Sequence, residues 1–187
     1  MMKAEKTITA DDKTIMTAIA RNAEYGFRLL LAAYKEMLYW HIRRIVVCHE
    51  DAQDAAQETF IKAFRHVGGF DRSNSLKAWL FRIATNEALR MLGKRKGVEV
   101  VSLDDADLLW IAATDEYYDD SDEKVCRLQK AIQSLPPKQQ LAFNMRYYDD
   151  MPYRDIALVI GSSEANVKAN YHVAKEKIIR FMNANEQ

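Results

Sequence analysis

The residues that could perform metal or acid–base chemistry are mostly carboxylates, so their spacing decides which chemistry is available. Glu50, Asp54 and Glu58 recur at four-residue intervals, as carboxylates do in helical metal sites. Such sites also need a histidine three residues after a carboxylate or a second helix of carboxylates opposite, and the sequence supplies neither. The four histidines do not converge in sequence: His41, His49, His66 and His172. We therefore predict no metal, no cofactor and no catalytic residue.

The same segment carries acids on a second face of its predicted helix. The apolar stripe that starts at Ala52 leaves Asp51, Asp54, Glu58 and Ile61 on a neighbouring face. An acidic face with one exposed apolar residue suits a protein partner rich in arginine. A solvated face with acids near a helix N-terminus gives the same pattern, so the spacing alone leaves both interpretations open.

Cations and amides gather on the next predicted helix. One of its faces carries Arg82, Asn86 and Arg90, with Phe81 and Leu89 nearby. Single-stranded DNA is bound by this mixture of cations, amides and aromatic surface. The Lys-Arg-Lys run at 94–96 could hold phosphates, although cations at a helix C-terminus also complement the helix dipole.

Residues 153–172 have the spacing of a helix-turn-helix. Ala157 keeps the first helix narrow where the second crosses it, Gly161 can adopt the positive φ of the turn, and Val167 packs the second helix onto the first. Ser163 is predicted to cap the second helix. The positions predicted to face DNA are Ser163, Glu164, Asn166, Lys168, Ala169, Asn170, His172 and Lys175. An ordinary helical hairpin with a glycine corner has the same three markers, so this interpretation needs its context.

Apolar residues elsewhere recur at helical intervals, and no segment alternates as a strand does. One inward-facing stripe runs from Ala52 through Phe64 to Val67, and a second begins at Leu76. Glycines at 68–69 and at Gly93 are predicted to end the two helices that carry them. An earlier helical segment is predicted to break at Gly26.

Charge divides the chain into three parts. The formal net charge is +0, yet residues 97–123 hold ten acids and no lysine or arginine, so the flanking parts are basic. We predict an all-α protein with two small helical domains, 15–96 and 124–187, joined by an acidic linker over 97–123, with about four short helices in the second domain. The basic parts are compatible with polyanion binding, although excesses of this size are common on protein surfaces.

Cys48 and Cys126 have no spacing typical of a disulfide framework or a zinc site. No stretch approaches the roughly 18 apolar residues of a membrane helix, so we expect a cytoplasmic protein without membrane insertion.

Three strings give the sequence a family resemblance that covers nearly the whole chain. They are EDAQDAAQETF at 50–60, SLKAWLFRIATN at 75–86, and SLPPKQQ at 134–140 followed by FNMRYY at 143–148. Together with the helix-turn-helix, they resemble the extracytoplasmic-function group of RNA polymerase sigma factors. In that family the first string is the helix that grips the polymerase clamp, the second reads and melts the minus-ten element, and the third leads into the domain that reads the minus-thirty-five element.

The resemblance implies roles for individual residues. Core polymerase would contact Asp51, Asp54, Gln57, Glu58 and Ile61. The minus-ten element would contact Phe70, Arg72, Asn74, Arg82, Asn86, Arg90, Lys94 and Arg95. Asn86 and the loop 70–74 are the candidates for reading a flipped base. Asn170 and Val173 stand where arginine is common in the family, so the recognition helix is less basic than most.

We therefore expect an alternative sigma factor that catalyses nothing, with core polymerase and promoter DNA as partners and an anti-sigma factor as a further one. The DNA would be the double-stranded upstream element and the melted minus-ten strand. A stand-alone helix-turn-helix regulator is the first alternative, and it would bind promoters without polymerase. A metal-dependent hydrolase built on the carboxylates at 50–58 is the second, and metal would stabilise it. The acidic linker would thread polymerase as a nucleic-acid mimic or serve only as a soluble tether.

Overall fold

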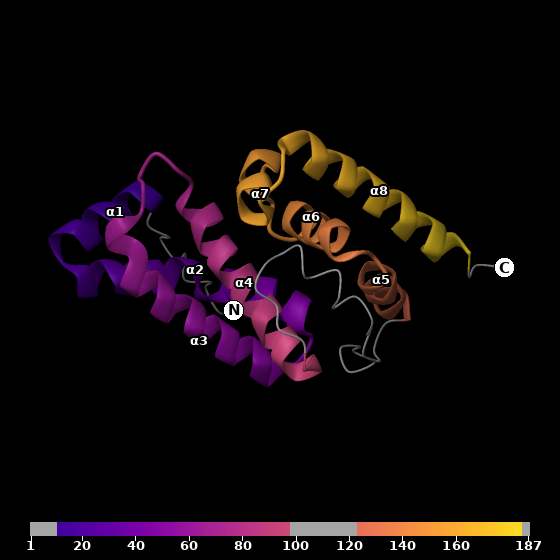
Figure 1. Ribbon diagram of the computed structural model, residues 1–187, viewed down its shortest axis with the longest axis horizontal. Helices are drawn as coiled ribbons and strands as arrows, with labels where there is room; N and C mark the ends of the chain where they lie inside the picture. The colour runs from indigo at the N-terminus through magenta and orange to yellow at the C-terminus, as the bar shows by residue number, and fades with distance from the viewer. Residues whose placement is uncertain (1–10, 98–122, 185–187) are drawn as a thin grey trace, which may run out of the picture.

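The computed structural model describes residues 11–97 and 123–184, and every regular element in these ranges is a helix (Figure 1). The N-terminal half contains α1 (Asp12–Arg21), α2 (Ala23–Val46), α3 (His49–His66), the 3-10 helix η1 (Val67–Gly69) and α4 (Leu76–Lys96). The C-terminal half contains α5 (Glu123–Gln133), α6 (Pro137–Tyr147), α7 (Tyr153–Ile160) and α8 (Glu164–Asn183). The all-α prediction is confirmed, and the predicted linker lies outside the described residues except at Gly97 and Glu123.

The first helix break lies at Asn22 and not at Gly26 as predicted. Asn22 is extended (φ −149°), and its side chain accepts the Tyr25 backbone N–H at 2.9 Å, which caps α2. Gly26 lies inside α2, at the point where α1 crosses it. A Cβ at this position would be 2.2 Å from the Ile19 backbone nitrogen. The glycine therefore permits close packing of two helices and does not end one.

The glycines near the ends of α3 and α4 act differently from each other. Gly68 and Gly69 belong to η1, which follows the end of α3 as predicted. Gly93 is buried inside α4, and the helix continues to Lys96. Gly97 caps α4 in the left-handed conformation (φ 68°), which a residue without a Cβ adopts readily. The predicted end at Gly93 is therefore wrong.

The core of the N-terminal half lies between α2, α3 and α4, and α1 packs on α2. Leu38 and Ile42 of α2 and Leu80 of α4 are fully buried. Phe64, predicted in the core stripe of α3, is instead 51% exposed. Its ring packs at the edge of the bundle, 5.0 Å from the Phe27 ring centroid.

In the C-terminal half, α7 and α8 form the predicted helix-turn-helix. Gly161 takes the left-handed conformation (φ 62°), and Ser163 Oγ accepts the Asn166 backbone N–H at 3.2 Å. Val167 is fully buried, so it holds α8 on the framework as predicted. α8 is 20 residues long and is therefore not one of the short helices expected.

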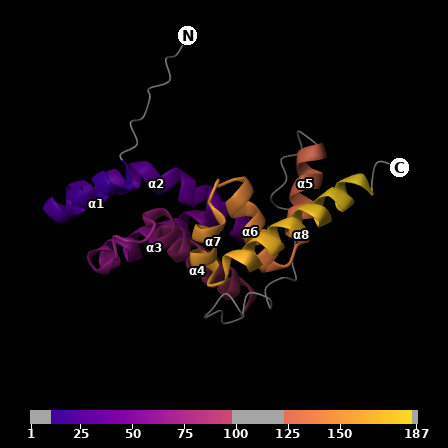
Figure 2. The ribbon, with the colours of Figure 1, turned by 90° about the horizontal axis from the view of Figure 1, so that it is seen from above.

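The two halves pack against each other, α7 on α4 and α6 on the C-terminal part of α2 (Figures 1 and 2). One apolar core runs through both halves and includes Leu80 and Phe81 from α4 together with Met145 from α6 and Ile156 from α7. A second, smaller core lies among α5, α6 and α8. The sequence predicted two helical domains but gave no sign of this shared core.

Candidate nucleic-acid and protein interfaces

The acidic face of α3 lies partly open. Asp54 and Gln57 are exposed, Ile61 is 40% exposed, and Asp51 and Glu58 are half-buried. Phe64 lies one turn after Ile61, so sequence reasoning missed an exposed apolar neighbour of this face by assigning Phe64 to the core. No local pattern distinguishes such an edge position from a core position.

Asp51 differs from the other acids of this face because it already has a partner. Its carboxylate lies 3.6 Å from the guanidinium of Arg95 at the end of α4. Within residues 11–97 and 123–184, no three histidine, cysteine, aspartate or glutamate side chains gather as a metal site would require. The face thus combines exposed acceptors with an exposed isoleucine, and Asp51 also joins α3 to α4.

The loop before α4 is shaped by an aspartate that sequence reasoning did not single out. Asp71 accepts hydrogen bonds from the Ser73 backbone N–H (3.0 Å), the Ser73 hydroxyl (2.8 Å) and the Asn74 amide (3.1 Å). The hydrogen bonds from Ser73 lower the pKa of the Asp71 carboxyl. The signal in the sequence is an aspartate two residues before a serine, which is typical of an Asx turn.

Two loop residues predicted to read DNA lie differently within this turn. Asn74 is exposed, whereas Phe70 is half-buried with its ring centroid 5.1 Å from that of Trp79. Arg72 is exposed beside them. The loop thus presents the exposed side chains of Arg72 and Asn74 next to the packed rings of Phe70 and Trp79.

The cationic face of α4 is present, but its predicted aromatic component is not. Arg82 and Asn86 are exposed, and Lys94 is exposed further along the helix. Phe81 is 0% and Leu89 4% exposed, because α4 is enclosed by α2, α3 and α7. The proposal that Phe81 and Leu89 add surface for bases is therefore wrong.

Arg90 is held by a carboxylate on its own helix. Its Nη2 lies 2.7 Å from Glu87, and Lys62 of α3 binds the other oxygen of that carboxylate. Burial opposes ionisation of Glu87, but the hydrogen bonds from Lys62 and Arg90 outweigh it, so the pKa of the Glu87 carboxyl is lowered. Arg90 therefore joins α4 to α3 through Glu87.

The predicted reading positions of the helix-turn-helix are largely open to solvent. All are exposed except Asn170, which is partly buried: Ser163, Glu164, Asn166, Lys168, Ala169, Asn170, His172 and Lys175. Ser163 uses its hydroxyl to cap α8. The other exposed side chains can address base edges and phosphates.

Asp149, in the loop between α6 and α7, binds three side chains of the N-terminal half. Its Oδ2 lies 3.1 Å from Nδ1 of His41, its Oδ1 binds the Arg44 guanidinium, and its backbone carbonyl accepts from Lys77 Nζ at 2.5 Å. The Thr85 hydroxyl donates to the Phe81 carbonyl at 2.8 Å and lies 2.9 Å from His41 Nε2. No sequence pattern predicts this cluster.

Helix α7 also lies against the candidate minus-ten residues. Leu158 of α7 lines a cavity of about 290 Å³ together with Phe70, Asn74, Trp79 and Arg82. The first helix of the helix-turn-helix therefore faces the loop and the helix predicted to read melted DNA.

These features define an all-α protein with a helix-turn-helix and an acidic, partly open face on α3. The sequence matches Sigma-70 region 2 over residues 30–98 and Sigma-70, region 4 over residues 127–178. It is 31% identical over 176 residues to the RNA polymerase sigma-H factor of Pseudomonas aeruginosa, covering 89% of this chain and 91% of that protein. It is 26% identical over 176 residues to the ECF RNA polymerase sigma-E factor of Escherichia coli K12, covering 89% and 92%.

Two solved structures share the fold. A complex of CnrH with the cytosolic domain of CnrY matches with a TM-score of 0.71 and 19% identity, over 94% of this chain and 99% of that chain. The sigma factor RpoE of Bartonella quintana, in complex with the anti-sigma factor NepR, matches with a TM-score of 0.66 and 22% identity, over 86% of this chain and 98% of that chain.

The chain belongs to the RNA polymerase sigma factors, in the extracytoplasmic-function group. It is an alternative sigma factor, which directs core polymerase to particular promoters and assists DNA melting. No helix in the described ranges is long and apolar enough to cross a membrane.

Proposed function

We propose that the two halves divide promoter recognition between them. Residues 15–96 bind core polymerase and read and melt the minus-ten element, and residues 124–187 read the minus-thirty-five element. The protein acts in the cytoplasm and catalyses no reaction itself. The observation that carries the proposal is the framework of the helix-turn-helix, in which Val167 is buried and Gly161 is left-handed, while the DNA-facing side of α8 is open.

Core polymerase would bind the open face of α3. Asp54, Gln57 and Glu58 offer acceptors to arginine, and Ile61 adds apolar area one turn further along α3. Asp51 contributes less directly, because Arg95 already partners it. A patch of this composition gives specificity through charge, with apolar contact adding affinity.

The minus-ten strand would follow the loop 70–74 and the exposed side of α4. Asn74, Arg82 and Asn86 are exposed and supply amides and a cation. Arg90 and Arg95 are in ion pairs with Glu87 and Asp51, so contact with phosphates would require them to exchange partners. Their main role would be to orient α4.

On α8, the amides and the lysines would act differently. Asn166 and Asn170 can pair with adenine through two hydrogen bonds, whereas Lys168 and Lys175 act on phosphates as point charges. Phosphate contacts set affinity and its salt dependence, and amides set the preferred sequence.

A third partner is proposed from the solved relatives, one of which contains an anti-sigma factor and the other the cytosolic domain of CnrY. An anti-sigma protein would silence this chain by covering surfaces that polymerase or DNA needs. Co-expression with a neighbouring reading frame, followed by purification, would identify it.

The polymerase-binding face is tested by Asp54→Lys combined with Glu58→Lys. Asp51 is left intact so that its contact with Arg95 is kept. We expect the variant to fold but to lose co-purification with core polymerase, while Glu176→Lys, an exposed charge reversal on α8, retains it. Wild-type yield of core with the α3 variant would disprove the assignment.

A further inference from the structure

We propose that Asp149 is a latch that holds this sigma factor in a closed arrangement, and that the protein must release the latch before it can bind a promoter. The latch itself follows from contacts between the two halves of the molecule. Its consequence for promoter binding rests on the proposed minus-ten role of the loop 70–74 and α4.

The Asp149 carboxylate is stabilised by the other half of the molecule. Its side chain is 2% exposed, and both ion pairs it forms within the described residues are with α2, through His41 and Arg44. A buried carboxylate that loses such partners is strongly destabilised unless water reaches it. The closed arrangement therefore places the negative charge of Asp149 beside His41 and Arg44, and opening must expose that charge to water.

Backbone hydrogen bonds within the C-terminal half support the loop that presents Asp149. The Tyr148 N–H donates to the Asn144 carbonyl at 2.9 Å, and the Met151 N–H donates to the Met145 carbonyl at 3.0 Å. Asp150 has a positive φ of 47°, which aspartate and asparagine tolerate better than most residues. The loop backbone is thus held by hydrogen bonds within its own half, although the Arg44 guanidinium of α2 also lies 4.8 Å from the Tyr148 ring centroid. Asp149→Asn leaves those backbone hydrogen bonds in place, so it should disturb the contact between halves and keep the loop intact.

Closure places α7 where melted DNA would lie. Leu158 shares a cavity with Phe70, Asn74 and Arg82, so a strand on that surface would have to displace α7. The helix-turn-helix would be covered less, because the reading positions of α8 stay exposed.

Promoter geometry also requires opening. The minus-ten and minus-thirty-five elements lie about 25 base pairs apart, which is about 85 Å of DNA at 3.4 Å per base pair. α8 has 20 residues, so it is about 30 Å long at 1.5 Å per residue. Because α8 packs on α7 and α7 packs on α4, the closed molecule cannot reach both elements at once.

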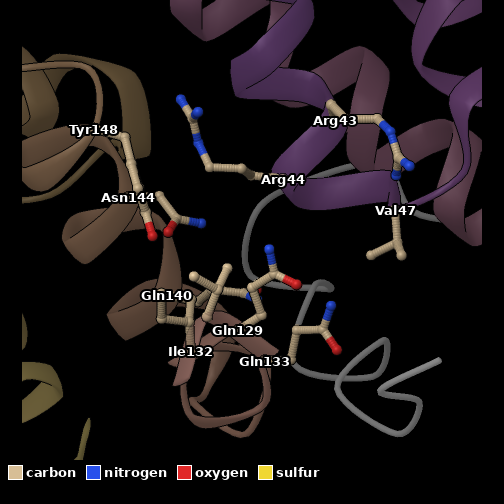
Figure 3. Close-up of a pocket in the computed structure, with 10 residues that line it drawn as sticks. Arg43, Arg44, Val47, Gln129, Ile132, Gln133, Gln140, Asn144 and Tyr148 are labelled. Carbon is tan, nitrogen blue, oxygen red and sulfur yellow. The ribbon is translucent and has the colours of Figure 1, made fainter. Parts of the chain in front are cut away.

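The interface between the two halves encloses buried polar atoms that favour opening of the molecule. A cavity of about 210 Å³ lies between the end of α2 and helices α5 and α6 (Figure 3). Asn144 is 2% exposed and lines it, and neither polar atom of its side chain has a hydrogen-bond partner within the described structure. Gln129 Oε1 and Arg44 Nε are also buried without one. Opening hydrates these atoms, which partly offsets the loss of the Asp149 contacts.

The test measures the distance between the halves in the full-length protein. Spin labels on Arg65→Cys in α3 and Glu176→Cys in α8, both exposed, report closure in a Cys48→Ser and Cys126→Ser background. Asp149→Asn keeps the shape of the side chain and removes its charge. Asp150→Asn is the matched control, because the Asp150 side chain is 95% exposed and its ion pair is with Arg146 of the same half.

We expect Asp149→Asn to raise the ratio of open to closed molecules on the order of 100-fold. Asp150→Asn should leave the distance distribution at that of the wild type. Arg44→Met attacks the same ion pair from α2, and its effect should not add to that of Asp149→Asn. If both variants keep the wild-type distribution, or if their effects simply add, the latch is disproved.

A second measurement separates the latch from its consequence for DNA binding. It is the affinity of the free protein for a fluorescent pool of random 12-nucleotide single strands. Affinity should rise with the open fraction, because only the open form is competent. Opening without a gain in binding would uphold the latch and overturn the assignment of α4 and its loop as the single-strand surface.

Discussion

His41 of α2 and Asp149 of the α6–α7 loop are 108 residues apart in sequence and hydrogen-bond at 3.1 Å in a buried contact. Thr85 of α4 lies at the other nitrogen of the same imidazole. The histidine of α2 therefore connects α4 to the α6–α7 loop of the other half, and its position depends on a hydroxyl as well as on a carboxylate.

Thr85→Val should destabilise the protein by about 1–3 kcal/mol, because it leaves His41 Nε2 buried without its hydrogen-bond partner. Thr59→Val is the matched control. Thr59 is equally buried, but its hydroxyl donates only to the Ala55 carbonyl of its own helix, 2.7 Å away. Urea unfolding should separate the two variants, and equal losses would show that the Thr85 hydroxyl has no role beyond its own helix.

Gly26→Ala should destabilise the packing of α1 on α2, since the new Cβ would meet Ile19 backbone atoms at 2.2 Å and 2.5 Å. Overpacking of this kind costs about 1–3 kcal/mol. A melting temperature lower by roughly 2–4 °C per kcal/mol would report it. Gly68→Ala meets no atom within 4 Å and should melt like the wild type. A Gly26→Ala protein as stable as the wild type would mean that α1 does not pack this closely.

Glu87 should make stability depend on pH at the acid end. Its folded pKa is lowered, so the stability it contributes is present above its unfolded pKa of about 4.3 and is lost as the pH falls through the folded value. Glu87→Gln should flatten the acid limb of a plot of unfolding free energy against pH, between about pH 3 and 6. Glu36→Gln, at an exposed position, should leave the limb unchanged. An unaltered slope in Glu87→Gln would contradict the ion-pair network with Lys62 and Arg90.

Asn170→Ala should change which upstream sequences are selected, whereas Lys168→Ala should weaken binding to all of them and reduce its salt dependence. Selection from a randomised minus-thirty-five library with holoenzyme measures both effects. A uniform loss of affinity in Asn170→Ala, with the same preferred sequence, would count against base reading at that position.

The parts of the fold that sequence predicted are those fixed by nearby residues. Gly161 and Ser163 act through their own φ and their own hydroxyl, so the turn of the helix-turn-helix could be predicted from their spacing. Exposure of Arg82 and Asn86 follows from helical periodicity in the same way.

The errors came from contacts between segments far apart in sequence. Helical periodicity puts Phe81 near the DNA-binding surface, but α4 is enclosed on more than one side, so a single apolar stripe does not describe it. A glycine in a helical segment predicts a break, and the close approach of Gly26 to Ile19 becomes visible only once the crossing of α1 and α2 is known. The Asp149 cluster left no periodic signal at all.

Run-off transcription on genomic promoter fragments tests the central claim most directly. With purified core polymerase, the protein should give transcripts from a subset of fragments that core alone does not transcribe, and Asp54→Lys with Glu58→Lys should abolish them. Promoter binding by the protein alone, with no transcript gained when core is added, would contradict its action as a sigma factor and would indicate a stand-alone helix-turn-helix regulator.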